Sequence, residues 1–139
     1  NDVTLADMQE KFNLSIQIRD EVSKANEAVI KIRAIKEKIN EEAKAKNSTV
    51  SKANQALITE LSSIEENLYQ VRNQSSQDPL NFPIKLNNKL ASLMRVVESG
   101  DYKPTAGSYK VFEELKAELA LEINHLDKVL AQKTIKKYL

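Results

Sequence analysis

The sequence predicts an all-α fold: an up-down antiparallel four-helix bundle with an over-long first helix. Apolar residues recur at steps of three and four along four separate segments, as in helices that bury one face. Only 2 glycines and 3 prolines occur in 139 residues, too few turn-forming residues for an all-β protein. A chain of this length fits one core, so residues 1–139 are expected to form a single domain.

The first helix is predicted from about residue 4 to residue 46. Thr4 can cap its first turn, and Asp7 can return the hydrogen bond, as in a capping box. From Ile18 onward the apolar residues keep heptad spacing, with Lys36 at one core position. The pattern slips around residues 13–16, where a bend or a change of the buried face is expected.

The second helix is predicted from about residue 50 to residue 73, with a heptad seam of its own. A short polar connection joins the first two helices into an antiparallel hairpin. Asn54 stands at the one polar position of this seam. It either fixes the register as a buried polar residue or lies at the frayed end of the bundle.

A proline-containing segment separates the second helix from the third. Leu80, Phe82 and Pro83 are expected to plug the end of the bundle, because Pro79 prevents the second helix from continuing. The third helix is predicted from residue 83 or 84 to residue 98. Gly100 is suited to a left-handed C-terminal cap.

The fourth helix is predicted to begin after Thr105, a suitable N-cap, and to end near residue 130. Its predicted buried face consists of Tyr109, Phe112, Leu115, Leu119, Ile123, Leu126 and Leu130. Residues 133–139 are basic with a few apolar positions. This segment is expected to fray, or to be the stub of something removed.

No catalytic, metal-binding or cofactor-binding residue is predicted. The chain has no cysteine and a single histidine, His125. Glu122 precedes it with the Glu-x-x-His spacing of di-iron bundles, but those centres need the motif twice, so His125 is interpreted as a solvated helix residue. The adjacent carboxylates at 41–42, 65–66 and 113–114 point in different directions on a helix and are also interpreted as solvated faces.

Charge and hydropathy argue against two classes of partner. The chain has 21 basic and 20 acidic residues and a net charge of +1, without the basic excess that a nucleic-acid-binding protein uses against phosphates. No run approaches the roughly eighteen apolar residues that a membrane span needs. Neither nucleic acid nor a membrane span is therefore expected.

The first helix is predicted to be longer than the helices that could cover it. At about 1.5 Å per residue it would extend roughly 60 Å, against roughly 22–40 Å for the others. Its N-terminal part must then bend back, project, or pack on something outside this chain. The expected docking surface consists of Leu5, Met8, Phe12 and Ile16.

The central and C-terminal half resembles a known family. The residues that carry the resemblance are Asp78-Pro79-Leu80-Asn81-Phe82-Pro83-Ile84-Lys85-Leu86-Asn87-Asn88-Lys89-Leu90-Ala91, then Gly100-Asp101, then Pro104-Thr105 with Tyr109, Phe112, Leu115 and Leu119. They are similar to the C-terminal helical region of bacterial sortilin-like, BNR-repeat β-propeller proteins, which are often labelled glycosyl hydrolases. Arg19-Asp20 and Ile32-Arg33-Ala34-Ile35-Lys36 resemble the first helix of the same region.

The resemblance implies an excised C-terminal domain of a larger, exported protein, located in the periplasm, at the cell surface or outside the cell. Its partners would be the upstream propeller domains of the same parent chain. The propeller motif Ser-x-Asp-x-Gly-x-x-Trp is missing here, and the chain has no tryptophan. Hydrolase activity is therefore not carried over to this segment, although the parent could be a glycosyl hydrolase.

Three functions follow as hypotheses. The first is a non-catalytic helical bundle that serves as a structural or interaction module of a propeller-bearing parent. The second is a part of a glycosyl hydrolase that contributes to glycan binding or hydrolysis, which would need a cleft with converging polar groups. The third is a homo-oligomer formed through the first helix.

Overall fold

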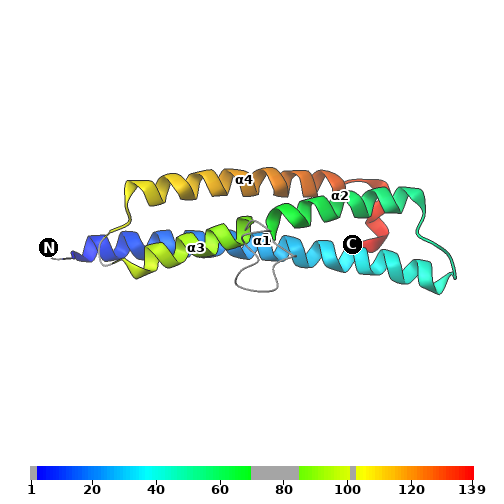
Figure 1. The fold of residues 1–139 in the computed structure, drawn as a ribbon, viewed down its shortest axis with the longest axis horizontal. Coiled ribbons are helices and arrows are strands. Elements are labelled where there is room, and N and C mark those ends of the chain that lie inside the picture. The colour runs from blue at the N-terminus through cyan, green and yellow to red at the C-terminus, as the bar shows by residue number, and fades with distance from the viewer. Residues whose placement is uncertain (1–2, 70–84, 101–102) are drawn as a thin grey trace, which may run out of the picture.

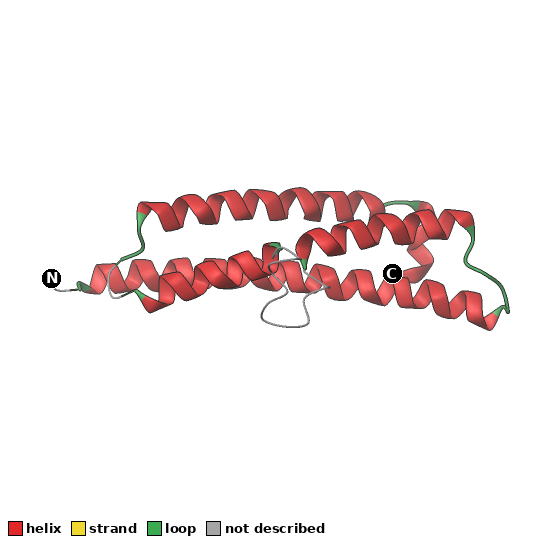
Figure 2. Ribbon diagram, viewed as in Figure 1, coloured by secondary structure: helices red, strands yellow, loops and turns green. Residues whose placement is uncertain are grey.

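The computed structural model describes residues 3–69, 85–100 and 103–139, which form helices joined by loops (Figure 2). The helices are α1 (Leu5–Ala45), α2 (Lys52–Leu68), α3 (Leu86–Ser99) and α4 (Ala106–Leu130), followed by the 3₁₀ helix η2 (Lys133–Tyr138). The described residues form no strand. The prediction of an all-α helical bundle is confirmed.

One long helix, α1, organises the bundle (Figure 1). α2 and α3 both run antiparallel to α1 and lie end on end along it, and α4 returns alongside both. One half of the bundle therefore consists of α1, α3 and α4, and the other half of α1, α2 and α4. This arrangement follows from length, because α2 (17 residues) and α3 (14 residues) are each less than half as long as α1 (41 residues), so neither can cover it alone.

α1 is capped as its sequence predicts. The Thr4 hydroxyl accepts a hydrogen bond from the Asp7 amide at 3.0 Å, and the Asp7 carboxylate accepts one from the Thr4 amide at 3.4 Å. At the other end, Asn47 adopts the left-handed conformation (φ 49°) as the chain turns toward α2. The helix stays unbroken through residues 13–16. Its buried face continues from Leu14 back to the half-buried Lys11 and Asp7, so the slip in the pattern marks the point at which the apolar residues leave that face.

The core is one continuous apolar cluster to which α1, α2, α3, α4 and η2 all contribute. Its largest fully buried side chains are Phe112, Leu14, Ile18, Ile32, Ile35, Ile39, Leu61, Ile64, Leu68, Leu90, Leu119 and Ile135. On α4 the predicted face is partly wrong, because Tyr109 is exposed and Val129 is buried instead. Ile123 and Leu130 are half-buried against the cluster.

Two expectations at the ends of α2 and α3 have different outcomes. The predicted plug at Leu80, Phe82 and Pro83 lies outside the described residues. The left-handed cap at Gly100 is wrong, since this residue is extended (φ −74°, ψ 145°). Its carbonyl instead accepts a hydrogen bond from the Lys11 ammonium group, which ties the end of α3 to the start of α1.

A buried carboxylate joins α1 to α2. Glu65 accepts hydrogen bonds from Arg33 Nε at 2.7 Å and from Lys36 Nζ at 2.6 Å, and its side chain is only 8% exposed. Lys36 also donates to Ser62 Oγ at 3.1 Å, and the Arg33 guanidinium lies 5.4 Å from the centre of the Tyr69 ring. The interpretation of Glu65 as part of a solvated face is wrong, because Glu65 is buried against α1, where it forms an ion pair with the half-buried Lys36.

The charges of this cluster keep Glu65 ionised. Burial raises the pKa of Glu65, but the hydrogen bonds and charges of Lys36 and Arg33 outweigh it, and the net pKa lies below the ordinary value of 4.5. The ionised carboxylate is therefore favoured more in the folded state than in the unfolded state. Its contribution to stability is present above about pH 4.5 and is lost as the pH falls through the lowered value.

We expect Glu65→Gln to lower the free energy of unfolding by roughly 1–2 kcal/mol at pH 7, because hydrogen bonds to a charged acceptor are lost. Urea unfolding followed by circular dichroism measures this change. The penalty should shrink as the pH drops below 4.5, where the wild-type carboxylate becomes protonated. Glu66→Gln, at the exposed neighbouring position, is the control and should change stability by less than about 0.5 kcal/mol. Equal effects of the two substitutions would contradict the buried ion pair.

Candidate functional site: an exposed apolar stripe on α1

The four residues predicted as a docking surface form a stripe at the N-terminal end of α1, here called the outer stripe. Leu5 is 82% exposed, Met8 56% and Phe12 60%. The fourth residue, Ile16, is half-buried. Three large apolar side chains thus stand in water on a capped, regular helix, where single exposed apolar residues are ordinary but a cluster is not.

The outer stripe points away from the core. Consecutive helix residues are rotated by about 100°, so residues two apart point in nearly opposite directions. Leu14 is buried, which turns Phe12 and Ile16 toward the outside of α1. Leu5 and Met8 precede Phe12 by seven and four residues and lie on the same side. Between residues 12 and 18, α1 therefore carries apolar residues on two opposite sides, the outer stripe and the side that faces the core.

The bundle holds this end of α1 in place without covering the outer stripe. The hydrogen bond from Lys11 to the Gly100 carbonyl fixes it to the end of α3. Tyr109 of α4 lies beside Glu10. Partial burial raises the pKa of Tyr109 most, and the negative charge of Glu10 and a hydrogen bond to it raise this pKa further. Lys11 and Glu10 thus hold one side of α1 against its neighbours while the opposite side stays free. The first turns of α1 extend beyond the start of α4 (Figure 1).

An apolar groove of about 540 Å³ lies between α3 and α4 in the same half of the bundle. Leu93 and Val96 contribute from α3, and Val111 and Leu115 from α4. Val96 is 61% exposed and Val111 42%. This half of the molecule therefore presents apolar surface on α1, α3 and α4.

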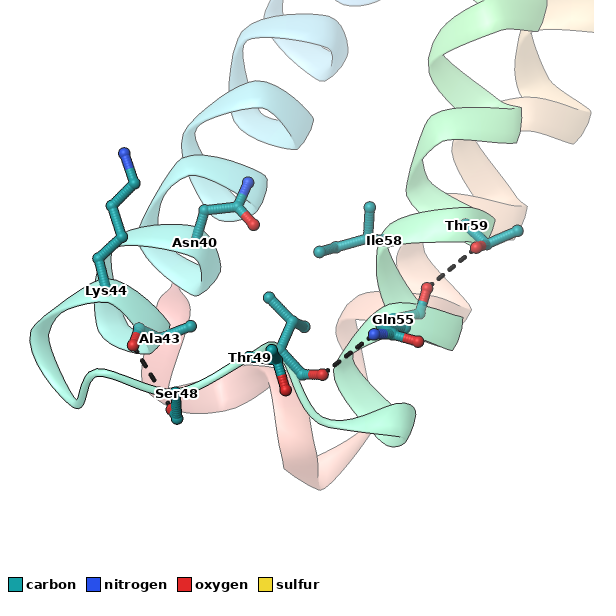
Figure 3. Close-up of a pocket in the computed structure, with 9 residues that line it drawn as sticks. Asn40, Ala43, Lys44, Ser48, Thr49, Gln55, Ile58 and Thr59 are labelled. Carbon is teal, nitrogen blue, oxygen red and sulfur yellow. Dashed lines mark hydrogen bonds between the residues drawn. The ribbon is translucent and has the colours of Figure 1, made fainter.

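A hollow of about 760 Å³ lies at the other end of the bundle, between the end of α1 and the start of α2 (Figure 3). Three of its polar side chains donate hydrogen bonds to the backbone. Ser48 donates to the Ala43 carbonyl at 3.4 Å, Gln55 to the Val50 carbonyl at 3.1 Å and Thr59 to the Gln55 carbonyl at 2.9 Å. Ser48, Gln55 and Thr59 thus satisfy backbone carbonyls near the end of α1 and the start of α2.

His125 is exposed, as expected. Its neighbour Glu122 is half-buried, and Glu122 Oε1 accepts a hydrogen bond from Asn67 Nδ2 at 3.0 Å, which links α4 to α2. Among the residues that the structure describes, no three His, Cys, Asp or Glu side chains gather where a metal ion could bind. In the same residues no helix is both long and apolar enough to cross a membrane.

The segment after α4 was expected to fray, and this expectation is wrong. It forms η2, which packs across α1, α2 and α4 with Ile135 and Tyr138 buried. Lys137 Nζ reaches Glu42 at 3.0 Å, and Lys46 reaches the same carboxylate at 3.2 Å. Hydrogen bonds from Lys137, Lys46 and Tyr138 lower the pKa of Glu42 to about 2. The sequence pattern missed this contact because the segment is too short to show a helical period.

We expect the Glu42 carboxyl to titrate near pH 2 in the folded protein, as measured by NMR of its side-chain carbon. Lys137→Gln should move the midpoint up toward 4.5, because the largest stabilising hydrogen bond is removed. Lys136→Gln, at the exposed neighbouring position, should leave it unchanged. A wild-type midpoint near 4.5 would show that η2 is not held against α1 in solution.

Comparison of the chain with known protein families, with curated proteins and with solved structures finds no match. The likeness to the helical region of BNR-repeat propeller proteins therefore stays an expectation from the residues quoted above.

Proposed function

We propose that this protein is a non-catalytic helical interaction module whose docking surface is the outer stripe of α1. The observation that carries the proposal is the exposure of Leu5, Met8 and Phe12 together on one side of a capped and continuous helix. Leaving a large apolar side chain in water forgoes roughly 1.5–3 kcal/mol of burial free energy. A partner that covers all three gains this free energy without unfolding any part of the bundle.

The spacing of the outer stripe suits a recognition helix. Anchors at i, i+3 and i+7 are the pattern by which a helix docks into an apolar groove or onto an apolar face of another protein. Leu5, Met8 and Phe12 have this spacing, and the Thr4 capping box keeps the first turn helical while its side chains are in water. The docking helix is thus preorganised, which lowers the entropic cost of binding.

We propose a β-propeller domain of a longer, exported parent chain as the partner. This choice depends on the resemblance described above and on the apolar chemistry of the stripe. The bundle would brace or extend the propeller, with α1 as the contact element. Self-association through the same stripe is the competing outcome.

A contribution to glycan binding or hydrolysis is the alternative. It requires polar groups that converge in a cleft, whereas Ser48, Gln55 and Thr59 in the hollow between α1 and α2 hydrogen-bond to backbone carbonyls. A hydrolysis assay and a glycan array on the purified chain test it directly. Reproducible turnover would overturn the proposal of a non-catalytic module.

We expect Met8→Ser combined with Phe12→Ser to change the free energy of unfolding by less than about 1 kcal/mol, because both side chains are already exposed. Leu14→Ser is the matched control on the same helix and should cost about 3 kcal/mol or more, because Leu14 is 1% exposed. Thermal unfolding followed by circular dichroism measures both. A large loss of stability in the double variant would show that the stripe belongs to the core.

The same double variant tests the partner. Binding of the wild-type chain to a separately expressed BNR-repeat propeller domain, measured by calorimetry, should be weakened at least about tenfold, a loss of about 1.4 kcal/mol. Light scattering measures self-association in parallel. If the wild type is a dimer and the double variant a monomer, the partner is a second copy of this chain and not a propeller. If the double variant binds the propeller domain as tightly as the wild type does, the outer stripe is not the contact.

A further inference from the structure

The segment from Lys133 to Leu139 contacts the bundle in the manner of a bound peptide. It reverses direction after α4 and lies across the end of the α1–α2 hairpin (Figure 1). Ile135 is fully buried and Tyr138 is 3% exposed, whereas Thr134 and Lys136 face solvent. Two anchoring side chains and exposed residues between them are typical of short-peptide recognition.

Side chains of α1 and α2 recognise this segment at three points. Lys38 Nζ donates to the Tyr138 carbonyl oxygen at 3.4 Å, and Asn54 Nδ2 donates to the Tyr138 hydroxyl at 3.1 Å. Glu42 accepts from Lys137 at 3.0 Å. The backbone, the aromatic hydroxyl and the basic side chain of the segment are thus each matched by a group on another element.

These contacts explain the one polar residue in the heptad seam of α2. Asn54 is half-buried, and its side-chain amide pairs with Tyr138 across the end of the hairpin. A leucine at this position would extend the apolar seam but would leave the tyrosine hydroxyl without this partner. Asn54 thus lies in the first turn of α2 and pairs with an aromatic residue from the C-terminal segment.

We propose that the end of the α1–α2 hairpin is a peptide-binding site, which this chain occupies with its own residues 135–138 and which binds the same segment of a second copy when it is vacant. The ligand class is a short peptide with an apolar residue, a lysine and a tyrosine at the spacing of Ile135, Lys137 and Tyr138. This site lies at the opposite end of α1 from the outer stripe and is independent of the function proposed for that stripe.

Under this proposal the segment leaves the site by local opening, which breaks its contacts with Lys38, Glu42 and Asn54. Two buried side chains oppose the conformational freedom of seven residues, and a 3₁₀ helix has poorer hydrogen-bond geometry than an α-helix. Such a segment opens locally without unfolding the bundle. A competing peptide can bind only those molecules in which the segment has left the site. Its apparent affinity is therefore reduced by the small fraction of such open molecules.

The test uses a fluorescent peptide with the sequence of residues 131–139, titrated against three full-length proteins by anisotropy. The wild type and a control with Lys136→Ser and Leu139→Ser keep the site occupied, since both changed residues are exposed. The double variant Ile135→Ser/Tyr138→Ser vacates it and should bind the peptide at least about tenfold more tightly than the other two. A peptide with Tyr138→Ser should bind none of them, and Asn54→Leu added to the vacated variant should weaken binding.

No binding to the folded vacated variant, or equal binding to all three proteins, would overturn the proposal. If that variant fails to fold, hydrogen exchange of the wild type decides instead. Amides of residues 135–139 should then exchange at least about a hundredfold faster than those at the centre of α1, through local opening. Exchange of both groups at one common rate would show that the segment leaves only when the bundle unfolds.

Discussion

The fold depends on the burial of one apolar face of α1, which runs from Leu14 to Ile39. A 41-residue helix cannot hide that face by itself, and neither of its antiparallel partners is long enough to do so. α2 and α3 therefore divide its length between them, and α4 packs along both. The position of each other helix follows from this requirement, as does the contact of η2 with the far end of α1.

The contact between α1 and α2 includes charge as well as apolar packing. Glu65, Lys36 and Arg33 place three charged groups beside the seam, where desolvation is costly unless every group is paired. Purely apolar seams would allow the two helices to slide by a turn, whereas a buried carboxylate with two fixed donors is satisfied in one register. The cluster thus restricts the alignment of α1 with α2.

The two ends of the bundle differ in how their surfaces are covered. At the start of α1, Leu5, Met8 and Phe12 remain in water while Lys11 and Glu10 hold the helix to its neighbours. At the other end, Ile135 and Tyr138 are inserted beside α1 and α2, and Glu42 with Asn54 secures them. An open apolar surface and an intramolecularly occupied site are thus about the length of α1 apart, which allows each to act without blocking the other.

The sequence by itself determined the four helices, the capping box at Thr4 and the surface residues Leu5, Met8 and Phe12, because these follow from periodicity and from contacts within a few residues along the chain. Only the tertiary structure decided that α3 continues along α1 beyond α2, that Glu65 is buried, that Gly100 is extended and that residues 133–139 are packed. Each of these depends on which distant residue lies opposite, such as Lys36 for Glu65, Lys11 for Gly100 and Asn54 for Tyr138. Local patterns carry no information about such pairings, since they are set by how whole helices pack.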